Sequence, residues 1–499
     1  MAVTPSSPVA SLQTAHPRRW AGLAVLATLQ FMLILDVSVV NVALPSIKSD
    51  LGFSASNLAW VVDAYVLVAG GFLLLGGRTA DLFGRRRTFL AGAVAFALGS
   101  LTSGLAQDQV MLIGSRALQG MGEALAGPAA LSIIALLFTD PNEKAKALSI
   151  WGALAGVGGT MGVILSGVIV DLASWRWIFW INLPVTAAVI IACLRVVPDD
   201  RHRSRTSFDF AGAVTATGGI TAMVYALLEA NRHGWTSATT LGFFVGGAAL
   251  IVAFVVIEGR VRAPLIPLRF FRSRRPRVAS GLMVLLASAL YGMFFLLTLY
   301  MQVGLGWSPL HAGVAYVAFG VAFLVAVAAG SQLLPKVGVR PLVVAGMVMA
   351  ATGFVLLTRL PIPVHYWTGL VPPMVLVAAG LSWCFVSLTV SAVSDASEAD
   401  AGLASGMVTT AQQVGGALGL AVLVSIASSR ASSLVGSGHS PAAAQLAGSH
   451  TAFAVGAGLL AAGAVLAALL IDRFKPAASP EPTPVTETSY ETELQPVAS

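Results

Sequence analysis

The chain has 499 residues, of which 57% are hydrophobic and only 10% charged, and its mean hydropathy is +0.84. Soluble proteins carry about 25% charged residues, so this composition excludes a soluble protein and predicts a polytopic membrane protein. The net charge of +7 does not indicate nucleic-acid binding, because the basic residues lie in short segments between apolar runs. Cys193 and Cys384 each lie within an apolar run, so neither a disulfide framework nor a metal site is expected.

Fourteen apolar runs follow one another along the chain, each close to the length that crosses a bilayer as a helix. Every run is predicted to be helical, because an open sheet leaves backbone groups without partners in lipid. The runs cover residues 20–44, 58–77, 88–106, 109–138, 147–170, 178–194, 210–228, 239–257, 278–303, 312–334, 341–358, 367–394, 401–429 and 451–471. The predicted fold is an all-α polytopic membrane protein with 14 transmembrane helices.

The lysines and arginines test this number, because they accumulate in cytoplasmic segments. With the N-terminus inside, 23 of the 29 basic residues fall in inner segments and 5 in outer segments, while Arg116 stays within a run. Both termini are therefore predicted to be cytoplasmic. The first apolar run is too long for a signal-peptide core, so no cleaved leader is expected.

A polar segment at residues 76–87 (GGRTADLFGRRR) recurs in weaker form as GSQLLPKVGVR between the tenth and eleventh runs. Aligning Gly338 with Gly84 places Pro335 on Asp81, so the second copy lacks the acid. The recurrence divides the chain into two six-helix halves with two helices inserted between them. The predicted divisions are a cytoplasmic tail (1–17), a six-helix bundle (18–205), two inserted helices (206–262), a second six-helix bundle (263–475) and a disordered cytoplasmic tail (476–499).

Five motifs give the chain a family resemblance. The pattern Gly77-x-x-x-Asp81-x-x-Gly84-Arg85-Arg86 resembles the signature loop of the major facilitator superfamily. Four further stretches are similar to motifs of its fourteen-helix drug:proton antiporters. They are residues 35–45 (LDVSVVNVALP), 116–122 (RALQGMG), 152–167 (GALAGVGGTMGVILSG) and 175–184 (WRWIFWINLP). The resemblance covers roughly residues 18–475, and it implies the major facilitator fold.

The resemblance implies a secondary transporter of the bacterial plasma membrane that exports drugs or other amphipathic small molecules in exchange for protons. We expect it to function as a monomer, driven by the proton gradient and without a cofactor. It also implies a cytoplasmic gate loop, in which Asp81 and Arg85 hold helix ends together. The glycines of the fifth-helix motif are interpreted either as close-packing positions or as a hinge and leak barrier. They are Gly152, Gly156, Gly158, Gly162 and Gly167, although Val163 replaces the usual proline of that motif.

Only four charged residues lie inside the apolar runs: Asp36, Asp63, Arg116 and Glu123. Charges within a membrane normally face a cavity or a partner, because each costs about 2.5–3.5 kcal/mol at the bilayer centre. Asp36 and Arg116 are predicted about 12 and 10 Å from the outer ends of their helices, so they can meet. Glu123 lies two turns below Arg116 on the same face. Asp63, close to the end of its run, is interpreted as an ordinary interfacial acid.

A carboxylate beside an arginine can change its proton affinity when helices move, because burial and a nearby cation have opposite effects. We hypothesise that Asp36 or Glu123 carries the proton and that Arg116 sets its affinity. Asn41 and Gln119 lie in the same motifs and are included in this predicted coupling or substrate site. The alternatives are a purely structural Asp36–Arg116 pair and a Glu123 that is either a substrate-specific cation site or a tolerated cavity residue.

Several polar and aromatic residues at membrane depth are candidates for lining the cavity. They are Tyr65, Phe294, Phe295, Trp383, Gln413 and Asn182, the last two being equally explained as links between helices. Other functions fit less well. No Gly-x-x-x-x-Gly-Lys-Ser/Thr motif, nucleophile–base pair or long segment outside the runs is present, which disfavours an ATP-driven pump, an enzyme and a sensor. An importer is disfavoured by the fifth-helix motif, whereas a dedicated exporter of one metabolite or antibiotic stays open.

Overall fold

The structure is a computed structural model, and it describes residues 18–54, 57–138, 140–198, 209–261, 264, 273–394 and 401–472. Within these residues all regular secondary structure is helical. The predicted terminal tails, residues 1–17 and 476–499, lie outside the described part. Eleven helices or helix pairs of the described residues are long and apolar enough to cross a membrane. The prediction of an all-α polytopic fold is therefore confirmed.

The first bundle is built from the helices before residue 199. They are α1 (Arg19–Leu51), the 3-10 turn η1 (Asn57–Ala59), α2 (Trp60–Phe83), α3 (Arg85–Gly104), α4 (Gln109–Leu137), α5 (Pro141–Leu172), α6 (Trp177–Trp180) and α7 (Asn182–Val196). An inserted hairpin follows, made of α8 (Phe210–His233) and α9 (Ala238–Arg260).

The second bundle is built from the helices after residue 273. They are α10 (Arg274–Leu299), the π-helical segment η3 (Tyr300–Gly304), α11 (Pro309–Ala315), α12 (Val317–Val337), α13 (Val339–Leu357), the π-helical segment η4 (Tyr366–Leu370), α14 (Val371–Val393), α15 (Ala401–Gly436) and α16 (Pro441–Leu470).

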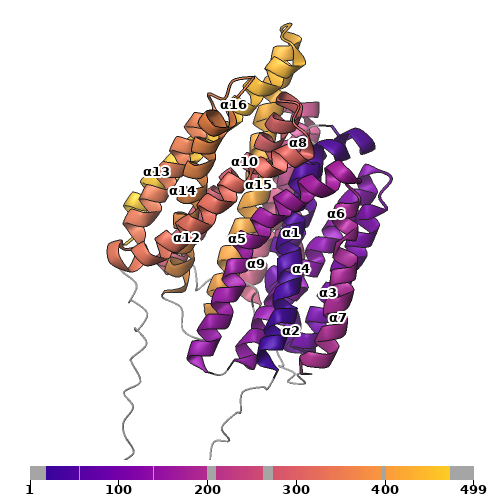
Figure 1. The fold of residues 1–499 in the computed structure, drawn as a ribbon, viewed down its shortest axis with the longest axis vertical. Helices are drawn as coiled ribbons and strands as arrows, with labels where there is room; N and C mark the ends of the chain where they lie inside the picture. The colour runs from indigo at the N-terminus through magenta and orange to yellow at the C-terminus, as the bar shows by residue number, and fades with distance from the viewer. Residues whose placement is uncertain are drawn as a thin grey trace, which may run out of the picture.

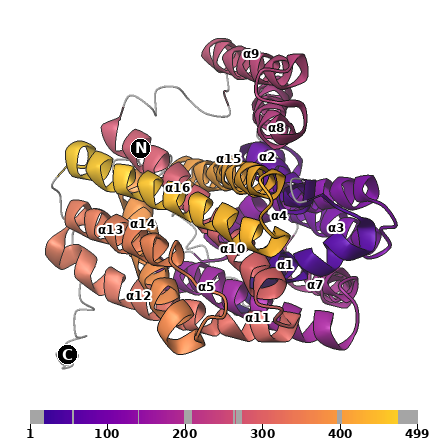
Figure 2. The ribbon, with the colours of Figure 1, turned by 90° about the horizontal axis from the view of Figure 1, so that it is seen from above.

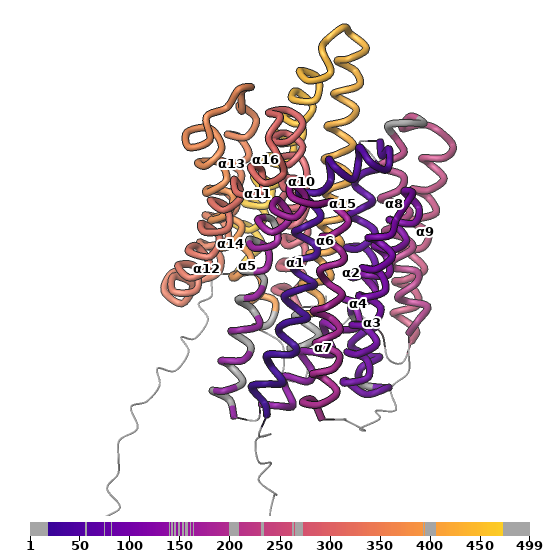
Figure 3. The backbone as a smooth tube through the Cα atoms, turned by 45° about the vertical axis from the view of Figure 1, so that its right-hand side comes forward, coloured from indigo at the N-terminus to yellow at the C-terminus, as the bar shows by residue number. Residues whose placement is uncertain are grey.

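The two bundles lie side by side, the first in indigo and magenta and the second in orange and yellow (Figure 1). Within the first bundle α4 packs against α2 and α3, and α1 packs against α5; within the second, α10 packs against α15 and α13 against α14 and α16. The hairpin of α8 and α9 lies at one edge beside α2 (Figure 2). It lies on the opposite side of the molecule from α12 to α14 (Figure 3).

The bundles contact each other at the end of the molecule where α1 ends and α2 begins, which we call the far end. There Nε2 of Gln302 in η3 donates to the backbone oxygen of Val42 in α1 at 2.7 Å. Gly167 of α5 faces α11 closely, because an added Cβ would lie 2.8 Å from the backbone oxygen of Pro309. The opposite end, where α1 begins and α16 ends, we call the tail end.

The predicted internal repeat corresponds to matching turns in the two bundles. Gly84 joins α2 directly to α3 with φ of 98°, and Gly338 joins α12 to α13 with φ of 89°. Residues with a Cβ rarely adopt such a conformation, so each turn requires glycine. Arg86 and Arg340 are each the second residue of the following helix. The alignment of Gly338 with Gly84 is thus matched by the backbone.

Candidate functional site

Asp36 and Arg116, which the sequence predicts at matching depth, form a buried ion pair between α1 and α4. Oδ2 of Asp36 accepts a hydrogen bond from Nη1 of Arg116. Oδ1 accepts from Nδ2 of Asn182 at 2.9 Å and from Nε2 of Gln119 at 3.0 Å. Asp36 is 1% exposed, and its three partners are 0% exposed. Three donors therefore compensate this carboxylate inside the first bundle.

A second layer of hydrogen bonds holds these donors in place. Nη1 of Arg116 also donates to Oε1 of Gln119, and its Nε donates to the backbone oxygen of Val61, both at 2.8 Å. Nε2 of Gln119 donates to the hydroxyl of Ser100 at 2.8 Å, and the Ser103 hydroxyl donates to Oε1 of Gln119 at 3.3 Å. The network thus joins α1, α2, α3, α4 and α7. Buried networks of this kind rigidify a bundle, and here Oδ1 of Asn182 is a member atom without a hydrogen-bond partner among the described residues.

Local sequence explains how α4 delivers these side chains. Residues 116, 119 and 123 are three and seven positions apart, so they share one face of the helix. Gly99 of α3 leaves room for Gln119, because an added Cβ would lie 2.6 Å from its Cγ. Gly120 brings α4 against α2, since a Cβ there would lie 2.3 Å from the backbone oxygen of Tyr65. Small residues therefore allow the polar face to reach its partners.

Tyr65 belongs to the Asp36–Arg116 network. The Arg116 guanidinium carbon lies 4.4 Å from the centre of the Tyr65 ring and 5.8 Å from that of Phe179. The Tyr65 hydroxyl donates to the backbone oxygen of Leu33 at 3.5 Å, and the side chain is 0% exposed. Tyr65 therefore covers the cation rather than lining a cavity in this conformation, and the desolvated contact adds cation–π attraction.

Glu123 lies beside this network and is linked to it through Tyr65. The Tyr65 side chain is a hydrogen-bond partner of the Glu123 carboxylate and lies within electrostatic range of Asp36 and Arg116. The Glu123 side chain is partly exposed, and its buried Oε2 has no hydrogen-bond partner among the described residues. Glu123 is therefore less fully compensated than Asp36, which has three donors. Asn41 is separate from both, because its Nδ2 donates to the backbone oxygen of Val37 at 3.0 Å.

The interpretation of Asp63 as an interfacial acid is wrong. Asp63 is 0% exposed, and neither of its carboxylate oxygens has a hydrogen-bond partner in the described residues. Counting residues from the end of an apolar run missed this burial, because η1 and the second bundle cover the start of α2.

The fifth-helix glycines place α5 against α1 beside Asp36. A Cβ at Gly162 would lie 2.7 Å from Cβ of Ser38, and one at Gly158 would lie 3.0 Å from Cγ2 of Ile34. The Ser166 hydroxyl donates to the backbone oxygen of Val39 at 2.6 Å. These positions are close-packing sites in this conformation. Gly152 and Gly156 also lie in α5, but their surroundings fall outside the described part.

The predicted gate loop is short and lies at the tail end. Gly77 is in contact with Pro128 of α4, since an added Cβ would lie 3.7 Å from it. Nη1 of Arg86 donates to the backbone oxygen of Val197 at 3.0 Å, which ties α3 to the end of α7. The predicted latch between Asp81 and Arg85 depends on the Asp81 side chain, which lies outside the described part.

The candidate cavity residues of the second bundle take different positions. Phe295 is 1% exposed and packs in the core, so it does not line a cavity here. Phe294 is partly exposed and stacks on Tyr316 with ring centres 5.0 Å apart. Gln413 is 6% exposed, and its Oε1 accepts from the Tyr291 hydroxyl at 3.0 Å, which makes it a link between α15 and α10. Trp383 has a buried Nε1 without a hydrogen-bond partner among the described residues.

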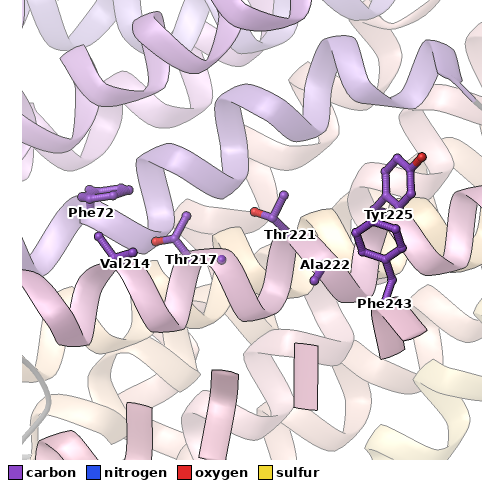
Figure 4. Close-up of a pocket in the computed structure, with 8 residues that line it drawn as sticks. Phe72, Val214, Thr217, Thr221, Ala222, Tyr225 and Phe243 are labelled. Carbon is purple, nitrogen blue, oxygen red and sulfur yellow. The ribbon is translucent and has the colours of Figure 1, made fainter. Parts of the chain in front are cut away.

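A groove with a volume of about 650 Å³ lies between α2 and the inserted hairpin, away from the Asp36 network (Figure 4). Phe72 of α2 and Thr217, Thr221 and Tyr225 of α8 line it, together with Phe243 of α9. The lining is mainly apolar, and the groove carries no charged residue. The groove therefore resembles the apolar, lipid-facing surface of a membrane protein and is not a second charged site.

Sequence reasoning missed part of the site. Ser100 and Ser103 gave no signal, because serine is common in helices that cross membranes and carries no charge. Asn182 was recognised only as a polar group at depth. The motif that contains it has a second anchor, because Trp175 Nε1 and Arg176 Nη1 donate to Oδ2 of Asp50 at 3.0 and 2.6 Å. Residues 175–184 thus fix α6 and α7 to the end of α1.

Comparison with known proteins places this arrangement in a family. The model of the Major Facilitator Superfamily matches residues 26–420. The puromycin resistance protein pur8 of Streptomyces alboniger is 40% identical, over 93% of this chain and 93% of its own. The lincomycin resistance protein of Streptomyces lincolnensis is also 40% identical, over 82% of this chain and 84% of its own. The fold is similar to the crystal structure of the POT family transporter PepTSo, with a TM-score of 0.67, 15% identity and coverage of 90% and 97%.

The chain belongs to the major facilitator superfamily, and it is therefore a multi-pass membrane transporter of small molecules rather than an enzyme. Its relatives include bacterial antibiotic resistance proteins of nearly the same length.

Proposed function

We propose that the protein exports antibiotics or other amphipathic small molecules across the plasma membrane in exchange for protons. Two relatives that are 40% identical are named for resistance to puromycin and lincomycin, and both match most of this chain. A third relative, which is 38% identical over 85% of this chain, is named as a cephamycin export protein. The Asp36–Arg116 network supports proton coupling, because it places a carboxylate with three donors near Glu123, a second acid whose Oε2 has no hydrogen-bond partner among the described residues.

The proposed topology has fourteen spans, with α2, α3 and α5 added to the eleven apolar segments. The tail end is then cytoplasmic, because the excess of lysine and arginine lies in the segments at that end. Both termini are inside, and the helices divide into six, two and six. Since the bundles contact each other at the far end, this conformation is closed to the outside and corresponds to an inward-facing state.

In this mechanism Glu123 exchanges the proton or receives a cationic substrate, and Arg116 sets the local field. Asp36 is the fixed partner of Arg116, since all three of its donors are buried with it. Rocking of the two bundles changes the hydration of Glu123 while the Asp36–Arg116 pair holds the local field fixed, and the change in hydration alters the proton affinity of Glu123. Proton binding and substrate binding at Glu123 then exclude each other, which is what an antiporter requires.

The observation that carries the proposal is the position of Glu123, whose buried Oε2 has no hydrogen-bond partner among the described residues, beside the Asp36–Arg116 ion pair in a chain related to resistance proteins. Efflux from proteoliposomes with an imposed pH gradient tests it, using puromycin, lincomycin and a panel of monovalent, divalent and neutral compounds. We expect gradient-dependent efflux of at least one antibiotic and at least a tenfold loss with Glu123→Gln. An efflux rate that does not depend on the pH gradient would contradict proton exchange.

A dedicated exporter of one antibiotic is the second candidate. The relatives' names, each of which gives a single antibiotic, favour it. Deleting the gene and measuring sensitivity to several unrelated toxic compounds separates the two. Sensitivity to one compound indicates a dedicated exporter, and sensitivity to several indicates multidrug efflux.

A further inference from the structure

Asp63 is a buried acid that the proposed mechanism does not use. It lies in the first turn of α2, at the far end. Its side chain is 0% exposed, and neither Oδ1 nor Oδ2 has a hydrogen-bond partner in the described residues. Asp36, at 1% exposure, has three donors on its two oxygens. The two aspartates are equally buried, yet only one is compensated.

Asp63 lies where the two bundles contact each other. Asp63 and Gly70 are seven residues apart on α2, so they share a face. That face is directed at α15, because a Cβ at Gly70 would lie 2.4 Å from Cβ of Gln413. Tyr291 of α10 donates to Gln413 and lies within electrostatic range of both Asp63 and Glu123. Asp63 is therefore enclosed by α2 of the first bundle and by α10 and α15 of the second.

We propose that Asp63 is a second proton-binding group, and that the far end closes only when its carboxyl carries a proton. An ionised carboxylate sealed there without a partner costs several kcal/mol, so the closed state selects the neutral form. Opening the far end separates α2 from α10 and α15 and admits water to Asp63. The carboxyl then ionises at neutral pH, and it must take a proton from the outside before the bundles close again.

The surrounding groups support a proton rather than a salt bridge as the switch. Titratable or charged side chains on α10 and on the elements packed against α2 are Arg19, Asp36, Lys48 and Asp50 on α1, Arg85, Arg86 and Arg87 on α3, Arg116 and Glu123 on α4, Tyr225, Glu229, Arg232 and His233 on α8, Arg274, Arg275, Arg277 and Tyr291 on α10, and Arg430 on α15. None of them is a hydrogen-bond partner of Asp63 in the described residues. Arg116 is committed to Asp36. The stretch 406–429 of α15 carries no charge.

The sign of the pH effect follows from this arrangement. The closed far end requires a proton on Asp63, so low pH favours closure and rising pH favours opening. The device rests on the proposed function, since it supplies the outside protonation step of a proton-driven exporter. It places proton uptake at the gate itself, one helix away from the Glu123 site.

The test measures the far-end distance directly and needs no substrate. Spin labels are placed on exposed residues of the two bundles through Gln107→Cys, between α3 and α4, and Arg359→Cys, after α13, in a background with Cys193→Ala and Cys384→Ala. Pulsed electron resonance of the purified full chain gives the distance distribution from pH 5 to pH 9. We expect the long-distance population to grow with pH, and to stay minor at every pH in Asp63→Asn. Asp63→Glu keeps a titratable group and should retain the transition.

An unchanged pH response in Asp63→Asn overturns the proposal. If Asp63→Asn does not fold, Asp63→Glu alone decides, because the longer side chain must shift the midpoint of the transition if this carboxyl is the titrating group. A midpoint equal to that of the parent protein contradicts the proposal. Asp171→Asn, at an exposed acid near the end of α5, is the matched control, and it should keep the pH-dependent distance change. Failure of the efflux assay with a normal distance change would reject the proposed function and leave Asp63 as a proton switch.

Discussion

Two buried aspartates of the first bundle, Asp36 and Asp63, lie in opposite environments. Asp36 lies inside the bundle with Arg116, Asn182 and Gln119 as donors. Asp63 lies between the bundles without a hydrogen-bond partner in the described residues. Burial is the same within 1% exposure. The two carboxylates therefore differ in the number of donors that compensate their charge. This number decides whether removing the charge destabilises the fold or favours the closed state.

The two aspartates also represent two different roles of buried acids in membrane proteins. A compensated acid inside one bundle keeps its partners when the bundles move as units, so it stabilises and orients. An acid in the contact between bundles changes its surroundings in every transport cycle, so it can respond to protons. Four predictions test this division, beginning with the largest expected effect on stability.

Arg116→Met removes the charged partner of Asp36 and is expected to have the largest effect on stability. It leaves Asp36 buried with an uncompensated charge, which costs about 3–5 kcal/mol. Thermal unfolding of the purified protein in detergent should show a large loss, and efflux should be abolished. The double variant Asp36→Asn with Arg116→Met removes both charges and should regain most of the stability. If the double variant is no more stable than the single one, the ion pair is not the source of the loss.

Asn182→Ala tests the outer donors of the network. It removes a 2.9 Å hydrogen bond to Asp36 and a 3.1 Å bond to Ser100, all within fully buried groups. We expect a loss of about 1–3 kcal/mol in unfolding free energy, because the partners are left unsatisfied. Asn41→Ala is the matched control, since Asn41 bonds only its own helix backbone at Val37. Equal losses in the two variants would contradict a special role for the network.

Gly338→Ala tests whether the second bundle keeps the backbone of the repeat although it lost the acid. The turn has φ of 89°, so a Cβ is strained there by about 1–3 kcal/mol. Gly84→Ala, at φ of 98°, should show a loss of similar size. Gly281 of α10 is a control, because a Cβ there meets no atom within 4 Å. Tolerance of alanine at both turns would show that the repeat has no backbone basis.

Asp63→Asn should have the smallest effect on stability, within about 1 kcal/mol of the parent protein, because no partner is lost. The same substitution at Asp36 removes an ion pair, so the two variants directly compare a compensated aspartate with an uncompensated one. Parallel unfolding of Asp36→Asn and Asp63→Asn in one detergent makes the measurement. A loss at Asp63 as large as that at Asp36 would indicate a hidden partner and would remove the contrast.

Much of the fold was accessible from the sequence because membranes impose simple rules. Apolar length and the alternation of basic residues predict helices, and the weak repeat at Gly338 predicts a matching turn in the second half. The pairing of Asp36 with Arg116 followed from depth alone, since few charges lie within the spans. These predictions depend on one-dimensional quantities that the sequence contains directly.

The rest depends on packing between segments far apart in the chain. Ser100 and Asn182 carry no charge, so nothing in the sequence connects them to Asp36. The burial of Asp63 depends on α10 and α15, which begin more than two hundred residues later. Tyr65 was predicted to line a cavity, but the guanidinium of Arg116 lies over its ring. Which face of a helix meets another bundle is a three-dimensional property that apolar runs do not encode.

Acids of the first bundle couple substrate efflux to protons in the proposed mechanism. The direct measurement records proton movement with a pH-sensitive dye and antibiotic movement with a radiolabel, in the same proteoliposomes. With the wild-type protein, we predict proton flow opposite to puromycin, rising in proportion to it. With Glu123→Gln, puromycin should still equilibrate down its own gradient while the proton flow per puromycin falls. An unchanged ratio of proton flow to puromycin flow in Glu123→Gln would contradict proton coupling through this acid.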